Sequence, residues 1–458
     1  MSALLTAYEG LSRPALEALQ LRRLQALLAR LWRDSAFYRA KLEEAGLGPE
    51  PVDSLEAFRA RVPFSDKRDF LADQEALPPF GARLAVDRSR VALINLTGGT
   101  SGQGQEVYGR TQADVQTLGY LHALPWYRAG LRPGHTVLNC VPTGGMTTGG
   151  WGPGEGIRIL GATALTPPAA LDTEARIDLM LRFRPLHFIY ASTNYLHRLT
   201  EALTARGLLP REAFPELVGV FIAAEGYPAA WAERVQELWG CPLHEGYGST
   251  QCVGFAAGTG PAGCLGPKGT RGAMQLFEWM TLCEVLDPES GRPVASGEEG
   301  ELVVTNLTVE ASPVLRFRTG DRVRFIAGAD CGSALDAIQC GGIGRYDDMM
   351  KIRGNNVWPD AVDATVFAFA EVSEYVGRVF TGSAGRTEVE ITVALKEAAL
   401  EQTGCAESGE RLAAAIGAAV KQRTNVAMRV RFAAREELPE FTYKARRWSD
   451  ERQAGYRL

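Results

Sequence analysis

Residues 97–102 read TGGTSG, a run of three glycines and three hydroxyl side chains in a chain of 458 residues. Glycines leave main-chain N–H groups open to an anion, and the hydroxyls of Thr and Ser add further donors. The run follows an apolar segment, residues 91–96 (VALINL), which we predict to be a buried strand. The nucleotide-hydrolase signatures GxxxxGKS and GxxxxGKT are absent. The pattern fits a phosphate site and a plain turn about equally, and the preceding strand favours the phosphate site.

Three further segments place polar side chains next to tight turns. Residues 245–251 read EGYGSTQ, residues 317–325 (FRTGDRVRF) place Asp321 after a turn between two β-like arms, and residues 344–359 read GRYDDMMKIRGNNVWP. In isolation, a Gly-Tyr-Gly turn is usually packing and a single Asp in a hairpin usually caps a turn. Near the end of the chain, residues 438–448 (LPEFTYKARRW) contain Lys444, which in isolation fits a solvated basic segment. The order of these segments is more informative than any one of them.

The elements that must position these residues follow from the apolar pattern. Leucines spaced as on one helix face predict a single amphipathic helix that begins near Ser12 and closes at Gly46. Apolar runs at residues 135–141, 187–192 and 217–224 alternate with helical stretches, which predicts an α/β core with parallel strands. Residues 284–307 hold two β-rich runs joined by Pro, Gly and Ser, as in a small antiparallel sheet or barrel.

The last hundred or so residues predict a separate small α+β domain. A helix at residues 361–369, a strand at 387–395, a helix at 410–422 and a strand at 427–433 follow one another there. We therefore divide the chain into a first domain of residues 1–346 and a second of residues 347–458.

Composition excludes several classes of function. The net charge of −5 and the absence of a basic run argue against nucleic acid as a partner. No run of 18 apolar residues predicts a membrane span, and no secretion signal begins the chain, so we expect a cytoplasmic protein. With the eight cysteines spread thinly, disulfides are not expected.

Taken in order, these segments resemble the adenylate-forming superfamily of acyl-CoA synthetases, and within it the phenylacetate–CoA ligase branch. The resemblance covers nearly the whole chain, including residues 24–46 (LQALLARLWRDSAFYRAKLEEAG) and 62–71 (VPFSDKRDFL). It implies an α/β fold with a large composite N-terminal domain, built of parallel-sheet α/β subdomains and a small β subdomain. A hinge would join that domain to a small α+β C-terminal domain.

The resemblance assigns roles to individual residues. TGGTSG matches the family's phosphate-binding SSGTTG loop, AAEGYP at 223–228 matches the turn that lies against adenine, and GYGST at 246–250 matches the motif beside the base and α-phosphate. Asp321 would bind the ribose hydroxyls. The implied nucleotide-binding residues are Thr97, Gly98, Gly99, Thr100, Ser101, Gly102, Ala223, Ala224, Glu225, Gly246, Tyr247, Gly248, Ser249, Asp321 and Arg345. Thr250 and Lys444 would be catalytic, and Asp347 would be the hinge.

The sequence departs from the family pattern in two segments. Gln251 stands where the family has a glutamate that binds magnesium, and an amide is a weaker ligand than a carboxylate for this hard cation. Gln103, Gly104 and Gln105 follow the glycine loop, where relatives often have a lysine.

The function that the resemblance implies is ATP-dependent activation of an aromatic (aryl or arylacetic) carboxylic acid to an acyl-AMP, followed by transfer to coenzyme A. ATP, Mg²⁺ and coenzyme A are the implied cofactors, and a homodimer is carried over from the branch. Two alternatives stay open: an amide synthetase that passes the acyl group to an amine, and a binding module without turnover. The candidate acid pocket consists of Trp126, Tyr127, Gly149, Gly150, Trp151, Ala223 and Tyr247.

A zinc site is a further hypothesis from the resemblance, since relatives in this branch can carry a structural zinc held by cysteines. The cysteines in the corresponding regions are Cys264, Cys331 and Cys340, to which Cys252 is a possible addition. Buried or loop thiols without a metal are the favoured interpretation.

Overall fold

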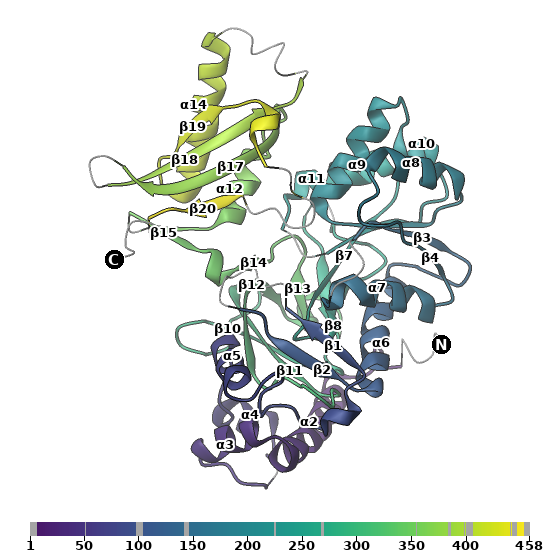
Figure 1. The fold of residues 1–458 in the computed structure, drawn as a ribbon, viewed down its shortest axis with the longest axis vertical. Helices are drawn as coiled ribbons and strands as arrows, with labels where there is room; N and C mark the ends of the chain where they lie inside the picture. Colours follow the sequence, from purple (N-terminus) through teal and green to yellow (C-terminus); the bar gives the residue numbers. More distant parts are fainter. Residues whose placement is uncertain are drawn as a thin grey trace. The chain divides into compact units, whose positions relative to one another are not determined.

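The structure is a computed structural model that describes residues 7–50, 52–97, 104–141, 146–223, 226–266, 270–353, 355–382, 386–397, 399, 406–439, 441 and 447–452 (Figure 1). Two compact units make up the chain. The first contains residues 1–224 and 232–343, and the second contains residues 225–231 and 344–458. The boundary predicted between residues 346 and 347 lies close to the start of the second unit's long segment.

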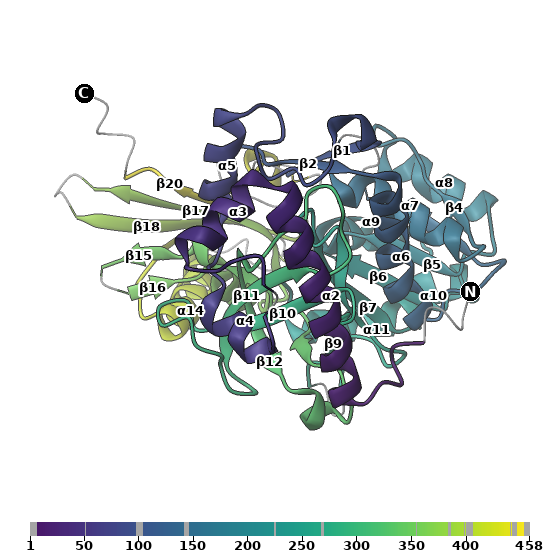
Figure 2. The same cartoon turned by 90° about the horizontal axis from the view of Figure 1, so that it is seen from below.

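Parallel strands form one half of the main sheet of the first unit. Their order is β4 (Thr163–Leu165), β3 (Thr136–Asn139), β5 (Phe188–Ala191), β6 (Gly219–Ala223) and β7 (Leu243–Ser249). The helices α6 (Gln112–Arg128) and α7 (Thr148–Ile159) cover one face of these strands, and α8 (Thr173–Arg182) and α9 (Thr193–Ala205) cover the other (Figures 1 and 2). The connections also contain α10 (Pro210–Ala213) and α11 (Ala229–Trp239). The predicted parallel α/β core is confirmed.

Antiparallel strands continue the same sheet beyond β7. They follow in the order β8 (Gly254–Thr259), β9 (Ala273–Leu276), β13 (Ala337–Gln339), β12 (Phe317–Ile326), β11 (Glu299–Asn306) and β10 (Thr281–Leu286). The antiparallel pair expected within residues 284–307 is β10 with β11, and it belongs to this continuous sheet.

The hairpin expected around Asp321 is wrong, because residues 317–326 form one strand, β12. Its pairing with β11 passes from Arg318 opposite Val303 to Arg322 opposite Glu301, so β12 contains extra residues between these pairs. Gly320 has a φ of +73°, a conformation that L side chains rarely adopt, and it lets the strand bulge without turning back.

The N-terminal region contains two helices where one was expected. α2 (Arg13–Asp34) ends at Ser35, whose hydroxyl accepts a hydrogen bond from the Tyr38 N–H and begins α3 (Ala36–Glu44). α4 (Leu55–Arg61) and α5 (Lys67–Ala76) follow. Figure 2 shows α2 as the long purple helix. The side chain of Gln20, on this helix, donates to the carbonyl of Glu278 at 3.0 Å.

The strand before the glycine loop is not buried as predicted. β1 (Leu93–Leu96) pairs with β2 (Val107–Arg110) in a separate two-stranded ribbon, and Ile94 is 40% exposed. The two strands precede and follow the glycine loop in the sequence, and they pair with each other as a hairpin does.

The second unit has its own sheet and core. The strand order is β19 (Arg429–Phe432), β18 (Thr387–Leu395), β17 (Val372–Thr381) and β20 (Trp448–Asp450), and α12 (Pro359–Val366) and α14 (Ala406–Thr424) pack together. Tyr375, Ile391 and Ile416 lie in its core. The unit also contains β14 (Gly344–Arg345) and the pair β15 (Met350–Ile352) and β16 (Asn355–Val357). All four elements predicted here are present, and β15, β16, β17 and β20 were missed. In neither unit is any described helix long and apolar enough to span a membrane.

Candidate active site

Loops from several elements meet at the carboxyl ends of the parallel strands. The Leu96 N–H, at the end of β1, donates to the carbonyl of Met146, which follows β3, at 2.8 Å. Arg110 on β2 donates to the carbonyl of Thr250, which follows β7, at 2.7 Å. These bonds bring the glycine-loop ribbon to the edge at which α/β sheets bind ligands.

Thr97 and Glu106 close the base of the glycine loop. The Thr97 N–H donates to the Glu106 carbonyl at 3.1 Å, and the Glu106 N–H donates to the Thr97 hydroxyl at 2.9 Å. Residues 98–103 lie outside the described residues, so the roles predicted for Gly98, Gly99, Thr100, Ser101 and Gly102 stay predictions. Of the described residues beside the loop, Glu106 contacts Gln251, in the turn that carries Thr250.

Tyr247 and Asp321 form a buried pair at the end of β7. The Tyr247 hydroxyl donates to Asp321 Oδ2 at 2.6 Å, and the two residues are 5% and 9% exposed. Burial and the adjacent Asp321 carboxylate raise the pKa of Tyr247 well above its ordinary value. The phenol therefore stays a neutral donor, and the pair joins two predicted nucleotide-binding residues that are far apart in the sequence.

The backbone of the Tyr247 motif is held closely by its surroundings. A Cβ on Gly248 would lie 2.3 Å from the carbonyl oxygen of Gly254, and one on Gly246 would lie 2.6 Å from the ring of Phe255. The Ser249 hydroxyl accepts a hydrogen bond from the Cys252 N–H at 3.2 Å in the turn that carries Thr250. Any side chain at either glycine would shift the strand that presents Tyr247.

Arg110 positions the turn after β7, a role that we did not predict. Its guanidinium also donates to Asn95 Oδ1 at 3.3 Å and to the Ser312 carbonyl at 3.4 Å. Burial lowers its pKa to about 10, so it stays a cation at neutral pH. An arginine inside the β-rich VYGRT segment is the sequence signal that could have pointed to it.

Glu106 and Gln251 form a second contact that we did not predict. The Gln251 side-chain N–H₂ lies 3.1 Å from Glu106 Oε1 and 3.0 Å from Oε2, and the Tyr108 hydroxyl donates to Oε1 at 2.8 Å. Glu106 is 1% exposed. A carboxylate thus lies directly beside the residue that departs from the family's magnesium-binding glutamate.

The residues predicted to form the acid pocket differ in how far they are buried. Trp126 is fully buried and stacks on Phe221 with ring centroids 4.4 Å apart, which places it in the core. Tyr127 packs against the Arg132 guanidinium at 4.3 Å. Gly149, Gly150 and Trp151 lie on α7, where Trp151 is 39% exposed, and Ala223 ends β6.

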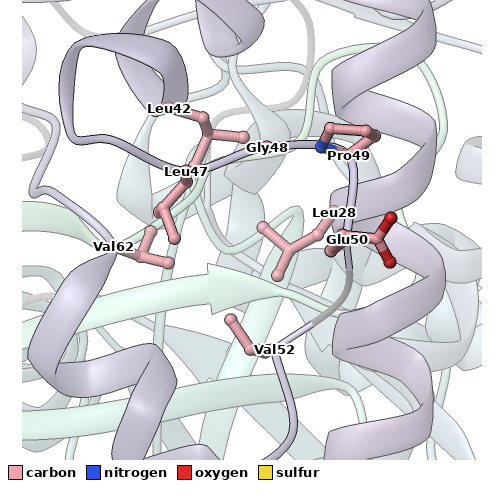
Figure 3. Close-up of a pocket in the computed structure, with 8 residues that line it drawn as sticks. All are labelled: Leu28, Leu42, Leu47, Gly48, Pro49, Glu50, Val52 and Val62. Carbon is pink, nitrogen blue, oxygen red and sulfur yellow. The ribbon is translucent and has the colours of Figure 1, made fainter.

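A hollow elsewhere in the first unit contains no predicted site residue. It lies among α2, α3 and the segment leading to α4 (Figure 3). Its lining is mostly aliphatic and consists of Leu28, Leu42, Leu47, Gly48, Pro49, Glu50, Val52 and Val62. It lacks the polar groups that a nucleotide requires.

The zinc hypothesis is changed by the structure. Cys264 and Cys340 come together with Glu245, with ligand atoms within 4.8 Å of one another. Neither Cys252 nor Cys331 joins this group within the described part of the chain. Two thiols and a carboxylate are possible zinc ligands, and zinc itself stays a prediction.

The remaining predicted residues belong to the second unit or lie outside the described residues. Arg345 is on β14, and Asp347 lies in the single helical turn of residues 346–348. Ala224, Glu225 and Lys444 are outside the described residues.

Comparisons with known proteins agree with these features. The sequence pattern of AMP-binding enzymes matches residues 27–310, and that of the AMP-binding enzyme C-terminal domain matches residues 354–452. The phenylacetate–coenzyme A ligase of Thermus thermophilus is 34% identical over 397 residues, which are 86% of this chain and 85% of that protein.

Solved structures are similar over both units. A crystal structure of 2-hydroxyisobutyryl-CoA ligase in the postadenylation state with 2-HIB-AMP has a TM-score of 0.83 and 26% identity and covers 96% of this chain and 90% of that one. The same ligase with 2-HIB-AMP and CoA in the thioesterification state has a TM-score of 0.65 and 27% identity and covers 95% and 90%.

Proposed function

Because the chain belongs to the AMP-binding enzymes, in the phenylacetate–CoA ligase-like branch of the adenylate-forming superfamily, and is an AMP-forming acid–CoA ligase, we propose that its substrate is an aromatic acid, aryl or arylacetic. The similarity to phenylacetate–coenzyme A ligase over most of the chain supports this class. Trp151, which is 39% exposed on α7, supports it as a surface for a flat ring. Since ATP and coenzyme A are cytoplasmic metabolites, we place the enzyme in the cytoplasm.

The first half-reaction is acid activation. A carboxylate oxygen attacks the α-phosphorus of ATP, the bond to the β-phosphate oxygen breaks, and pyrophosphate leaves. The observation that carries the proposed site is the Tyr247–Asp321 contact of 2.6 Å beside the glycine-loop ribbon. Asp321 accepts from the ribose hydroxyls, and Thr250 binds the α-phosphate.

Charge develops between two anions in this step. The ammonium of Lys444 stabilises that charge, which is why a lysine is needed at this position. Magnesium, when bound with ATP, neutralises phosphate charge and orients the leaving group. The described oxygen donors near the glycine loop that suit such a hard cation are the Glu106 carboxylate and the Gln251 amide.

The second half-reaction forms the thioester. The thiolate of coenzyme A attacks the acyl carbonyl carbon, and AMP leaves with the electrons of the acyl–phosphate bond. We assign residues 1–346 to the adenylating domain and residues 347–458 to a mobile domain that turns about Asp347 between the two steps. The postadenylation and thioesterification states of the related 2-hydroxyisobutyryl-CoA ligase support two working states.

Pyrophosphate release with ATP and magnesium tests the proposal, with aryl, arylacetic and aliphatic acids in turn, with and without coenzyme A. We expect release with aryl or arylacetic acids, increased by coenzyme A, together with the mass of an aryl-CoA thioester. Preference for an aliphatic acid would overturn the substrate class. Release that coenzyme A leaves unchanged would favour the amide synthetase, and silence with all acids despite ATP binding would favour the binding module.

The Lys444→Ala variant tests the catalytic assignment in the same assay, with Arg446→Ala as its neighbouring control. We expect Lys444→Ala to lower pyrophosphate release by about 100-fold or more, since it removes a cation used in the transition state. Unchanged release would contradict the assignment.

A further inference from the structure

The position of Gln251 leaves the site one carboxylate short of the family pattern. A glutamine is neutral, and an amide oxygen is a weaker ligand than a carboxylate for Mg²⁺. The glycine loop and the residues after it, 97–105, contain no lysine or arginine that could take over charge neutralisation of the phosphates. Binding of the ATP–metal complex therefore needs a charged ligand from another position.

Glu106 is the carboxylate nearest to that position. Both of its oxygens lie within 3.1 Å of the Gln251 side-chain nitrogen. Its backbone is paired with Thr97, so the side chain is tied to the base of the phosphate loop. The residue at the end of the phosphate loop, Glu106, therefore places its carboxylate at the side chain of position 251, in the turn after β7.

The direct contacts of Glu106 are with neutral groups, and the nearby buried cations Arg83 and Arg110 lie over the ring of Tyr108, at 4.8 and 5.1 Å from its centroid. The groups in contact with it are the Gln251 amide and the Tyr108 hydroxyl, both neutral, and the described part of the chain gives it no ion pair within 4.0 Å. A carboxylate that is 1% exposed and has no direct ion pair is costly to bury. A divalent cation would supply a counter-charge.

The orientation of Gln251 fits the same purpose. Its N–H₂ group faces the carboxylate, so the amide oxygen points to the opposite side, and Asn306 holds the backbone of Gln251 through its carbonyl at 3.1 Å. The amide thus donates to the carboxylate and fixes its orientation.

We propose that Glu106 provides the charged oxygen ligand for the magnesium ion of the ATP complex, in place of the glutamate that position 251 lacks, and that Gln251 orients it. In this contact the carboxylate comes from position 106 and the amide from position 251. This inference rests on the proposed function, because it assumes that ATP binds at this loop.

Binding of Mn²⁺, a paramagnetic substitute for Mg²⁺, tests whether Glu106 is the charged ligand. Its affinity is measured by electron paramagnetic resonance on the full chain with a non-hydrolysable ATP analogue. We expect Glu106→Gln to weaken Mn²⁺ binding by about tenfold to 100-fold. The reciprocal double variant Glu106→Gln/Gln251→Glu should restore it, because it returns one carboxylate to the same contact. Glu174→Gln, the same change on an exposed residue of α8, is the control and should bind Mn²⁺ as the unmodified protein does.

Thermal unfolding gives a second readout. Without metal, Glu106→Gln should melt no lower than the unmodified protein, since it removes a buried charge that has no direct ion pair, and its shift on adding Mn²⁺ and nucleotide should shrink. Unchanged Mn²⁺ affinity in Glu106→Gln, or a double variant that stays as weak as the single one, would overturn the inference. If Glu106→Gln does not fold, Glu106→Asp decides: it keeps the charge but shortens the side chain by one methylene, and an unchanged Mn²⁺ affinity in this variant would overturn the inference.

Failure of this inference is distinguishable from failure of the proposed function. If the unmodified protein makes thioester and Glu106→Gln binds Mn²⁺ normally, the inference alone is wrong. If no acid yields pyrophosphate and no nucleotide-dependent Mn²⁺ binding occurs, the proposed function fails.

Discussion

At the residue scale, the Tyr247–Asp321 pair explains how one carboxylate can be reserved for a ligand. The phenol donates to one oxygen of Asp321. Because the pKa of Tyr247 is raised, its hydroxyl stays protonated and remains a donor to the carboxylate. A carboxylate has about four acceptor positions, so one carboxylate can in general accept from a phenol and from ribose hydroxyls at the same time.

Replacing Asp321 by Asn should weaken ATP binding. The amide keeps the shape but loses the charge, and hydrogen bonds to charged groups contribute about 1.5–3 kcal/mol, so the KM for ATP should rise by about tenfold or more. The KM for the acid should change less, and the exposed Asp330→Asn should change neither. Steady-state pyrophosphate release gives both constants, and an unchanged KM for ATP in Asp321→Asn would remove Asp321 from the site.

Motif residues were predicted, whereas their supporting contacts were not. Tyr247, Thr250 and Asp321 lie in segments that have a recognisable order along the chain. Arg110 and Glu106 act through contacts with residues about 140 positions away, and only the fold brings these together. A single sequence contains no signal for such pairs.

At the element scale, apolar runs predicted the strands well, and local breaks were predicted poorly. β3, β5 and β6 agree with their runs because parallel strands are buried on both faces. Ser35 divides α2 from α3, and Gly320 bulges β12, because a hydroxyl cap and a positive φ act over one or two residues. β1 pairs only with its hairpin partner, which an apolar run does not reveal.

The contact of α6, α7 and β8 is built around one histidine. His122 Nδ1 lies 2.9 Å from the Leu118 carbonyl oxygen, and a Cβ on Gly152 or Gly254 would lie within 3.0 Å of the ring. Burial lowers the pKa of His122 to about 4. The packing therefore requires a neutral imidazole.

This requirement predicts a pH dependence of stability. Between about pH 4 and 6.5 the unfolded chain binds a proton at His122 that the folded chain does not, so stability is complete above about pH 6.5 and is lost as the pH falls through this window. The loss from this group is about 2 kcal/mol at pH 5. Urea unfolding at pH 7.5 and pH 5 should show a smaller difference for His122→Leu than for the unmodified protein or the exposed His197→Leu. Equal differences in all three would contradict it.

At the scale of the whole molecule, the two units have separate cores, and each contains residues that we assign to the reaction. Asp321 and Thr250 belong to the first unit, and Arg345 and Lys444 belong to the second. The sequence suggested this division because the element pattern begins again after the GRYDD segment. We propose that the units turn relative to each other about Asp347.

Proline at position 347 should separate the two half-reactions. Proline fixes φ near −65° and removes a backbone N–H, which restricts rotation at the hinge. We expect Asp347→Pro to slow thioester formation by about tenfold more than pyrophosphate release, equivalent to about 1.4 kcal/mol. Asp347→Ala, which keeps the rotation, should change both rates little. Rapid-quench measurement of both products decides, and equal slowing of both steps by the proline would argue against a hinge at this residue.

The separation of the β1–β2 ribbon from the main sheet has a consequence for how such enzymes diversify. No ladder bond fixes the ribbon to β3 or β7 in the described residues, and Arg110 and the Leu96–Met146 bond hold it there instead. The phosphate loop can therefore gain or lose residues without changing the register of the strands that shape the acid pocket. Nucleotide handling and acid preference can drift independently, and a carboxylate at position 106 beside a glutamine at position 251 is the kind of change that such independence permits.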